Sequence, residues 1–136
     1  MNKIVDFNGI GYVAATFPVD EATIAYLKAN HLNASTGNVD INGKNLAVKL
    51  GADGKVGFGT GTEALLGIIM AYEMDGFCSV QIAGGVDLVP SAEAVEAGNK
   101  ALAVNAKGEI VVAEGSRDTV VAKPSTAENL FASIIL

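Results

Sequence analysis

The side chains that most often carry out catalysis are scarce in this sequence. One histidine, His31, and one cysteine, Cys78, occur in 136 residues. A nucleophile needs a base within hydrogen-bonding distance and a third group that orients the base. His31 lies in a polar stretch just after a predicted helix end, so we interpret it as a solvated loop residue. Cys78 lies in an apolar stretch, which favours a small core residue.

Metal binding and acid–base catalysis find little support either. One cysteine and one histidine cannot supply the usual zinc ligands, and they exclude an intrachain disulfide. Paired carboxylates can act as general acid and base. The candidate pairs are Asp40 with Asp87, and Glu73 with Asp75. Acids beside turns are usually solvated or cap a backbone amide, so we assign no catalytic, cofactor-binding or metal-binding residue and expect no enzymatic activity.

The stretch 57–62, Gly-Phe-Gly-Thr-Gly-Thr, is rich in glycine, as phosphate-binding loops are. It lacks the GxGxxG spacing, the lysine of a P-loop, and a clear strand before it and helix after it. We therefore interpret these residues as the flexible end of a strand.

Charge and hydropathy exclude several classes of partner. The net charge is −6, without a block of Lys or Arg, so the positive surface that nucleic-acid binding requires is missing. Arg117, the only arginine, is predicted on a loop as a solvated charge. The longest apolar run, 64–72, is about half the length that crosses a bilayer. Residues 1–6 lack the apolar core of a signal peptide. We expect synthesis in the cytoplasm, with no nucleic-acid or membrane partner.

A strand and a helix are predicted near the N-terminus. Residues 10–17 have the β-branched and aromatic content of a strand, which Pro18 ends because proline cannot donate to a ladder. Asp20 is placed as the N-cap of a helix over residues 21–30. The polar residues 30–38 then form an exposed loop.

From residue 39 onward, short apolar runs alternate with glycine-containing turns, which is typical of a barrel or sandwich. Strands are predicted at 46–50, 56–59, 65–72, 77–83, 101–105, 110–113, 119–122 and 130–136. Periodicity alone does not separate a strand from a short helix at 65–72, but the flanking glycines favour a strand. Residues 90–98 could form one helical turn with Ser91 as its N-cap.

The sequence also repeats itself, because residues 47–82 align without a gap with residues 101–136. Gly61 meets Gly115 in this alignment, and Phe77 meets Phe131. The lead-in 39–41 before the first copy is matched with 86–88 before the second. We interpret the chain as an internal duplication. The last strand would expose an apolar edge unless it lies in the core or under another subunit.

A composite pattern of glycine-rich stretches covers residues 39–136. It comprises an Asp-Gly turn within 48–56, the Leu-Leu-Gly-Ile-Ile run at 65–69, and the stretches 76–89 and 97–110. This pattern resembles the capsid cement, or head decoration, proteins of tailed bacteriophages. The residues at the expected positions are Gly67, Gly76, Val80, Gln81, Gly84, Gly98 and Gly108. The departures are Asn99 in place of a common aspartate and Val121-Ala122-Lys123 in place of Gly-Val-Ala.

The resemblance implies a mainly β fold, a small β-barrel of the β-tulip type, here with an internal duplication and one short N-terminal helix. It also implies a homotrimer that binds the major capsid protein on the outside of the virion and stabilises the shell, without a cofactor. Residues 1–38 match nothing in the family. We therefore divide the chain into two parts. Residues 1–38 form an N-terminal strand and helix segment, which is a possible capsid-contacting arm, and residues 39–136 form a duplicated β-barrel domain.

Two other functions stay open. One is a virion surface or fibre-head module that binds host glycan. Such sites use exposed aromatic side chains, and the chain has no tryptophan and three tyrosines. The other is a small barrel enzyme, which would need clustered carboxylates with shifted pKa values in a cleft.

Overall fold

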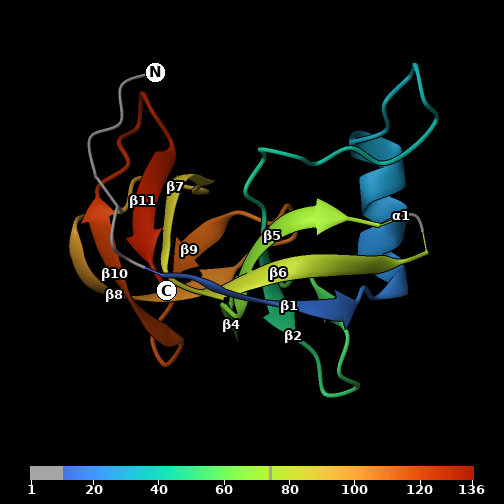
Figure 1. The fold of residues 1–136 in the computed structure, drawn as a ribbon. Helices are drawn as coiled ribbons and strands as arrows, with labels where there is room; N and C mark the ends of the chain where they lie inside the picture. The colour runs from blue at the N-terminus through green and yellow to red at the C-terminus, as the bar shows by residue number, and fades with distance from the viewer. Residues whose placement is uncertain (1–10, 74) are drawn as a thin grey trace.

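The computed structural model describes residues 11–73 and 75–136. In these residues one helix, α1 (Glu21–Asn30), and eleven strands form two antiparallel sheets that lie side by side (Figure 1). The strands are β1 (Val13–Pro18), β2 (Ala47–Leu50), β3 (Val56–Gly57), β4 (Glu63–Ala64), β5 (Gly67–Tyr72), β6 (Phe77–Ala83), β7 (Gly85–Pro90), β8 (Gly98–Val104), β9 (Ile110–Val112), β10 (Arg117–Lys123) and β11 (Phe131–Ile135). The predicted mainly β fold, a small barrel with one short helix, is confirmed.

The two sheets are built on the same plan. The first has the order β1-β6-β5-β2-β3, and the second runs β7-β11-β10-β8, with β4 and β9 both paired to β8. Apart from β4, each consists of a leading strand followed by two hairpins, β2-β3 and β5-β6 in one, β8-β9 and β10-β11 in the other. We call residues 13–83 repeat 1 and residues 85–135 repeat 2. The helix α1 lies at the outer end of repeat 1 (Figure 1).

The strand registers show how closely the repeats correspond. Lys49 pairs with Gly57 in repeat 1, and Ala103 pairs with Val111, each 54 positions later, in repeat 2. Both second hairpins also carry a register shift opposite equivalent residues, Val80 and Ser79 in β6 and Ile134 and Ser133 in β11, which are 54 positions apart. The facing residues, Ile69 and Ala71 in β5 and Val121 and Lys123 in β10, are 52 positions apart, so the correspondence is offset by two residues in these strands. A shared irregularity of this kind is a feature of the fold rather than of one strand.

The predicted pairing of the two lead-ins is wrong. Residues 86–88 belong to β7, which pairs with β11 as β1 pairs with β6. Residues 39–41 lie outside the strands. The counterpart of β7 is therefore β1, and the two strands end alike, with Pro18 opposite Phe77 and Pro90 opposite Phe131.

Local signals located several elements correctly. Asp20 is the N-cap of α1, and its Oδ1 accepts a hydrogen bond from Thr23 N at 2.8 Å. The ambiguous run at 65–72 contains the strand β5. The closing strand β11 lies between β10 and β7, where Ile134 is fully buried. Both backbone edges of this strand are thus paired within the chain itself, while Phe131 at its start stays exposed.

The helical turn predicted at 90–98 is absent, because tertiary contacts hold this segment in an irregular path. Ala92 N donates to Ile110 O at 3.0 Å. Val95 is buried, and its N–H donates to Ser125 Oγ at 2.8 Å, while Ser125 N donates to Val95 O at 3.0 Å. Each of these bonds joins distant parts of the chain, so no local signal could indicate them.

The buried apolar side chains form two core clusters, the first built from repeat 1 alone and the second from repeat 2 together with Ala47, Leu65 and Ile68 of repeat 1. The first core contains Val19, Leu27, Ile41, Leu46, Val48, Val56, Ile69, Cys78 and Val80. The second contains Ala47, Leu65, Ile68, Val86, Val89, Val95, Leu102, Val104, Ile110, Val121, Ala132 and Ile134. Phe58 packs against both. Burial of each such side chain contributes about 1.5–3 kcal/mol, so the two cores supply most of the stabilisation.

The segment 1–38 contributes structure to repeat 1 in its described part. The strand β1 pairs with β6, and Leu27 of α1 is fully buried in the first core. Residues 1–10, the beginning of the arm predicted to contact a capsid, lie outside the described residues. No helix among the described residues is long and apolar enough to cross a membrane.

Candidate functional site

The candidate carboxylates are held by separate partners. Asp87 Oδ1 accepts from Ser133 Oγ at 2.7 Å, whereas Asp40 Oδ1 accepts from Asn42 N at 3.2 Å. Glu73 and Asp75 are exposed beside the turn between β5 and β6. Within residues 11–73 and 75–136, no three His, Cys, Asp or Glu side chains are close enough to hold a metal ion. Neither candidate pair therefore belongs to a metal-binding cluster in this part of the chain.

Cys78 is fully buried in the first core, as predicted. Burial, with a smaller effect of the Glu73 charge, raises the pKa of its thiol to about 12. The thiolate is the reactive form of cysteine, so this side chain stays protonated and acts as a small apolar group.

The amides and hydroxyls of the glycine-rich stretch bind the carboxylate of Glu63, a role for Glu63 that the sequence did not indicate. Glu63 Oε1 accepts from the backbone N and the hydroxyl of Thr60, each at 2.8 Å, and from the N and hydroxyl of Thr62, each at 3.2 Å. Gly59 N and Gly61 N donate to carbonyl oxygens of Asn105 and Val104. The amides of residues 59–62 are thus occupied, and a phosphate would have to displace the carboxylate.

Arg117 is not the solvated loop residue that its surroundings predicted. It begins the strand β10 and is half-buried. Its guanidinium donates to Leu66 O at 2.6 Å and to Ile82 O at 3.4 Å, both in repeat 1. The only arginine of the sequence therefore links repeat 2 to repeat 1 by hydrogen bonds.

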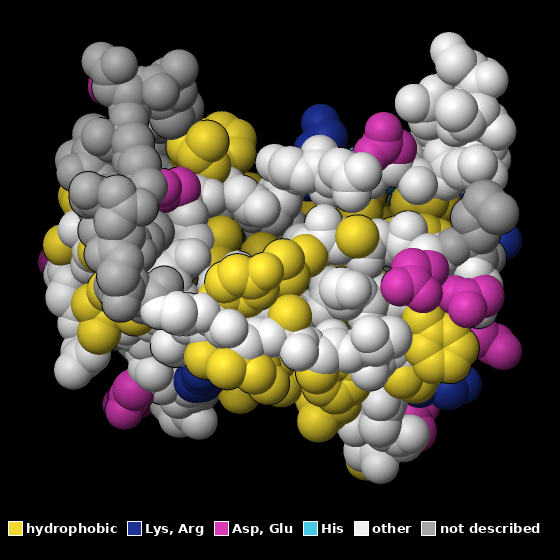
Figure 2. All heavy atoms as spheres, viewed as in Figure 1, with side chains coloured by type: hydrophobic (Ala, Val, Ile, Leu, Met, Phe, Trp, Pro, Cys, Tyr) yellow, Lys and Arg dark blue, Asp and Glu magenta, His cyan; other side chains and the backbone are white. Residues whose placement is uncertain are grey.

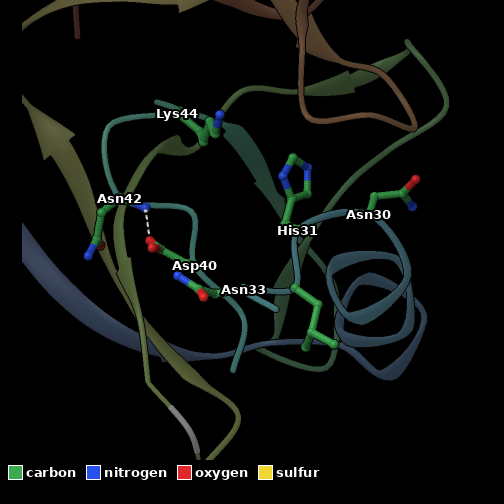
Figure 3. A pocket seen from close by; sticks show the side chains of 7 residues that line it. Asn30, His31, Asn33, Asp40, Asn42 and Lys44 are labelled. Carbon is green, nitrogen blue, oxygen red and sulfur yellow. Dashed lines mark hydrogen bonds between the residues drawn. The ribbon is translucent and has the colours of Figure 1, made fainter. Parts of the chain in front are cut away.

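The described surface has a polar hollow of about 430 Å³ at the C-terminal end of α1. Its lining residues are Asn30, His31, Leu32, Asn33, Asp40, Asn42 and Lys44. Figure 3 shows the His31 ring and Lys44 on one side of the hollow and Asp40 beside Asn33 on another, whereas the Asn30 side chain points away. Donors and acceptors from distant positions in the loop are thus brought together.

Backbone hydrogen bonds fold the loop that forms this hollow. His31 N donates to Leu27 O at 2.8 Å and ends the helix, and Asp40 N donates to His31 O at 2.9 Å. Between them, Asn33 Oδ1 accepts from Ser35 N at 2.9 Å and from Thr36 N at 3.3 Å. These bonds turn the chain back and set Asp40 next to the helix end.

His31 is half-buried rather than solvated. Burial, and secondarily the positive charge of Lys44, lower the pKa of the imidazole below its ordinary value of 6.5. The ring is therefore neutral at pH 7, with one donor and one acceptor nitrogen. The charges of Asp40 and Lys44 balance each other, so the hollow has no net charge.

A second, mainly apolar hollow of about 280 Å³ adjoins the first, and Lys44 lines both. Its other lining residues are Gly43, Leu88 and Phe131. Asn45 fixes the loop to repeat 2, because its side-chain amide donates to Asp87 O at 2.7 Å. Phe131 is 42% exposed, which supplies an aromatic surface that the tyrosine and tryptophan count did not suggest.

Exposed apolar side chains also occur away from the hollows. Figure 2 shows hydrophobic groups across the middle of the face on which β1 and β6 lie, with acidic groups gathered towards the α1 end. The most exposed large ones are Tyr12, at 63%, and Val13, at 55%, where the strand β1 begins.

Comparison of the chain with protein-family models, curated proteins and solved structures found no match.

Proposed function

We propose that this chain is a capsid decoration protein, which binds the outside of a tailed-phage capsid as a homotrimer and stabilises the shell. The motif resemblance at residues 39–136 suggests this class of protein. The observation that carries the proposal is the outer edge of β1, because it offers an apolar surface and backbone hydrogen-bonding groups together.

A comparison of the two leading strands supports the use of this edge. In repeat 2, the outer edge of β7 is covered by Asn45, which donates to Asp87 O and more weakly to Leu88 O. In repeat 1, β1 pairs with β6 on one side only, as far as the described residues show. Tyr12 and Val13 are exposed there.

An edge strand of this kind fits a structural role. Unpaired backbone groups next to apolar side chains pair readily with another chain, and strand addition supplies main-chain hydrogen bonds as well as apolar contact. In a trimer each contact with the capsid occurs three times. The overall avidity then exceeds the affinity of a single contact by orders of magnitude. Modest contacts of β1 would therefore suffice to hold neighbouring capsid subunits.

The proposal is tested with undecorated capsids of the virus that encodes the chain. We expect the purified protein to have three times the 13.8 kDa mass of one chain by light scattering. It should co-sediment with these capsids and raise the temperature at which they release DNA. A protein that neither binds the capsids nor changes this temperature contradicts the proposal.

A pair of valine variants locates the contact. Val13→Glu places a charge on the β1 edge, and we expect about a tenfold or greater loss of capsid affinity because the carboxylate must be desolvated. Val112→Glu is the matched control, since Val112 of β9 is 50% exposed. It should bind like the wild type. Equal loss in both variants would exclude β1 as the contact.

A further inference from the structure

We propose that the polar hollow and the adjoining apolar hollow together form a binding site for a neutral oligosaccharide. The ligand would extend from Asp40 and Asn33 in the polar part, past Lys44, to Phe131 in the apolar part. This site is separate from the β1 edge and does not depend on the proposed role in capsid decoration.

The polar part presents a donor and an acceptor side by side. Asn33 uses its carbonyl oxygen to accept from Ser35 N and Thr36 N, which leaves its amide nitrogen as the donor group. Asp40 uses Oδ1 to accept from Asn42 N, and the described residues supply no hydrogen bond to Oδ2. Figure 3 shows the two side chains next to each other. Adjacent hydroxyl groups of a sugar, each both donor and acceptor, match this arrangement.

The electrostatics favour a neutral ligand. Asp40 and Lys44 cancel each other's charge, and the His31 imidazole is neutral at pH 7. The C-terminal end of α1 adds the partial negative charge of the helix dipole, which opposes a phosphate or carboxylate. A metal cation would meet a single carboxylate and the Lys44 ammonium. Hydroxyl-rich uncharged molecules remain the class that the lining groups can satisfy.

The apolar part is shaped by a bulge in β7 that has no counterpart at the equivalent position of β1, where the register shift lies earlier in the strand, between Val13 and Ala14. In β7, Asp87 and Leu88 lie between Val86 and Val89, while the facing strand has the single residue Ser133 in that interval. The corresponding part of β1, residues 14–18, pairs one to one with β6. Bulges of this kind redirect side chains and are frequent next to binding sites.

Backbone strain is concentrated at the same place. Among the described residues, Asn45 and Leu88 are the only non-glycine residues with positive φ, at 53° and 60°. They are adjacent in space, because the Asn45 amide donates to Leu88 O at 3.4 Å. A leucine rarely adopts this conformation, and such strain tends to persist at ligand sites. Leu88 and the exposed ring of Phe131 thereby form an apolar wall against which the carbon face of a sugar ring can pack.

Saturation-transfer NMR of the full chain tests the proposal. The probes are neutral trisaccharides, namely maltotriose, cellotriose, mannotriose and N,N′,N″-triacetylchitotriose, with inorganic phosphate as the anionic probe. We expect saturation transfer to at least one trisaccharide. We also expect that inorganic phosphate does not displace the bound trisaccharide. Asp40→Ala and Phe131→Ala should each weaken binding about tenfold, since each removes a direct contact.

The repeats supply matched controls. Phe77 is the counterpart of Phe131, is 40% exposed, and lies opposite Pro18 as Phe131 lies opposite Pro90. Phe77→Ala and Asp53→Ala should leave the affinity within about twofold of the wild type. Absence of transfer to all four trisaccharides, displacement by phosphate, or equal loss in Phe77→Ala and Phe131→Ala would each overturn the proposal, provided that circular dichroism shows the variants folded. Capsid binding of the same variants is measured separately. It tests the decoration hypothesis, so failure of the sugar site can be told apart from failure of that hypothesis.

Discussion

Glu63 stabilises the turn at residues 59–62 because one carboxylate oxygen satisfies two backbone amides and two hydroxyls. These bonds, first those from Thr60 and then those from Thr62, lower the pKa of Glu63 from 4.5 to about 2. A group with a lowered pKa in the folded state stabilises the protein when it is ionised. Its contribution is complete above pH 4.5 and is lost as the pH falls through about 2.

Glu63→Gln should therefore be less stable than the wild type at pH 7 and indistinguishable from it at about pH 2. The side chain is partly exposed, so water screens the bonds, and we expect a difference of about 1 kcal/mol at pH 7. Urea denaturation at a series of pH values measures it. Glu114→Gln, on an exposed turn, controls for the loss of one negative charge. A Glu63→Gln difference that stays constant down to pH 2 would contradict the assigned bonds.

Individual residues were predictable where their partners are close in sequence. Asp20 caps a helix three residues away, and its residue type indicates that role. Arg117 has its partners 51 and 35 positions away, at Leu66 and Ile82, so its function depends on how the repeats pack. Phe131 was recognised only as the counterpart of Phe77. The hollow beside it arises from a bulge in another strand, which no local pattern indicates.

At the scale of elements, the positions of the hairpins can be predicted from their turn residues. The contacts between neighbouring strands depend instead on how closely their backbones approach each other. The Asp53-Gly54 and Lys107-Gly108 turns are visible in the sequence, and both join paired strands. The helix and the strands are mostly located correctly for this reason. The failures are the segment 90–98 and the lead-in 39–41. Hydrogen bonds to Ile110 and Ser125 hold the first in an irregular path, and the bond from Asp40 N to His31 O folds the second against the end of α1.

Gly67 illustrates such a requirement inside the first sheet. A Cβ atom at this position would overlap the carbonyl oxygen of Gln81 on β6 and lie 2.8 Å from a Val80 side-chain carbon. The backbone cannot yield without breaking the β5-β6 ladder, so we expect Gly67→Ala to lower the free energy of unfolding by about 3 kcal/mol. Urea denaturation monitored by circular dichroism measures this loss.

Gly11→Ala serves as the control for that variant, because a Cβ there meets no atom within 4 Å. Its stability should lie within about 0.5 kcal/mol of the wild type. A Gly67→Ala protein as stable as Gly11→Ala would show that β5 and β6 are less closely packed than their register implies.

At the scale of the whole molecule, two similar repeats built around two core clusters could in principle unfold one after the other. Several contacts oppose this. Ala47 N donates to Gly108 O at 2.7 Å, and Leu65 N donates to Leu102 O at 3.1 Å, so each bond joins repeat 1 to repeat 2. Phe58 packs against both cores, and Arg117 bonds across the same boundary. Loss of one repeat would expose these groups on the other.

Two equivalent core truncations test this coupling. Val80 and Ile134 occupy the same position in repeats 1 and 2, and both are fully buried. Val80→Ala and Ile134→Ala should each cost about 2–4 kcal/mol. We expect one calorimetric transition in both variants, shifted down by about 3 °C for each kcal/mol, because the repeats share the contacts around Phe58 and Arg117. Two resolved transitions, of which only one moves in each variant, would show instead that the repeats are independent units and that a partner could bind one while the other unfolds.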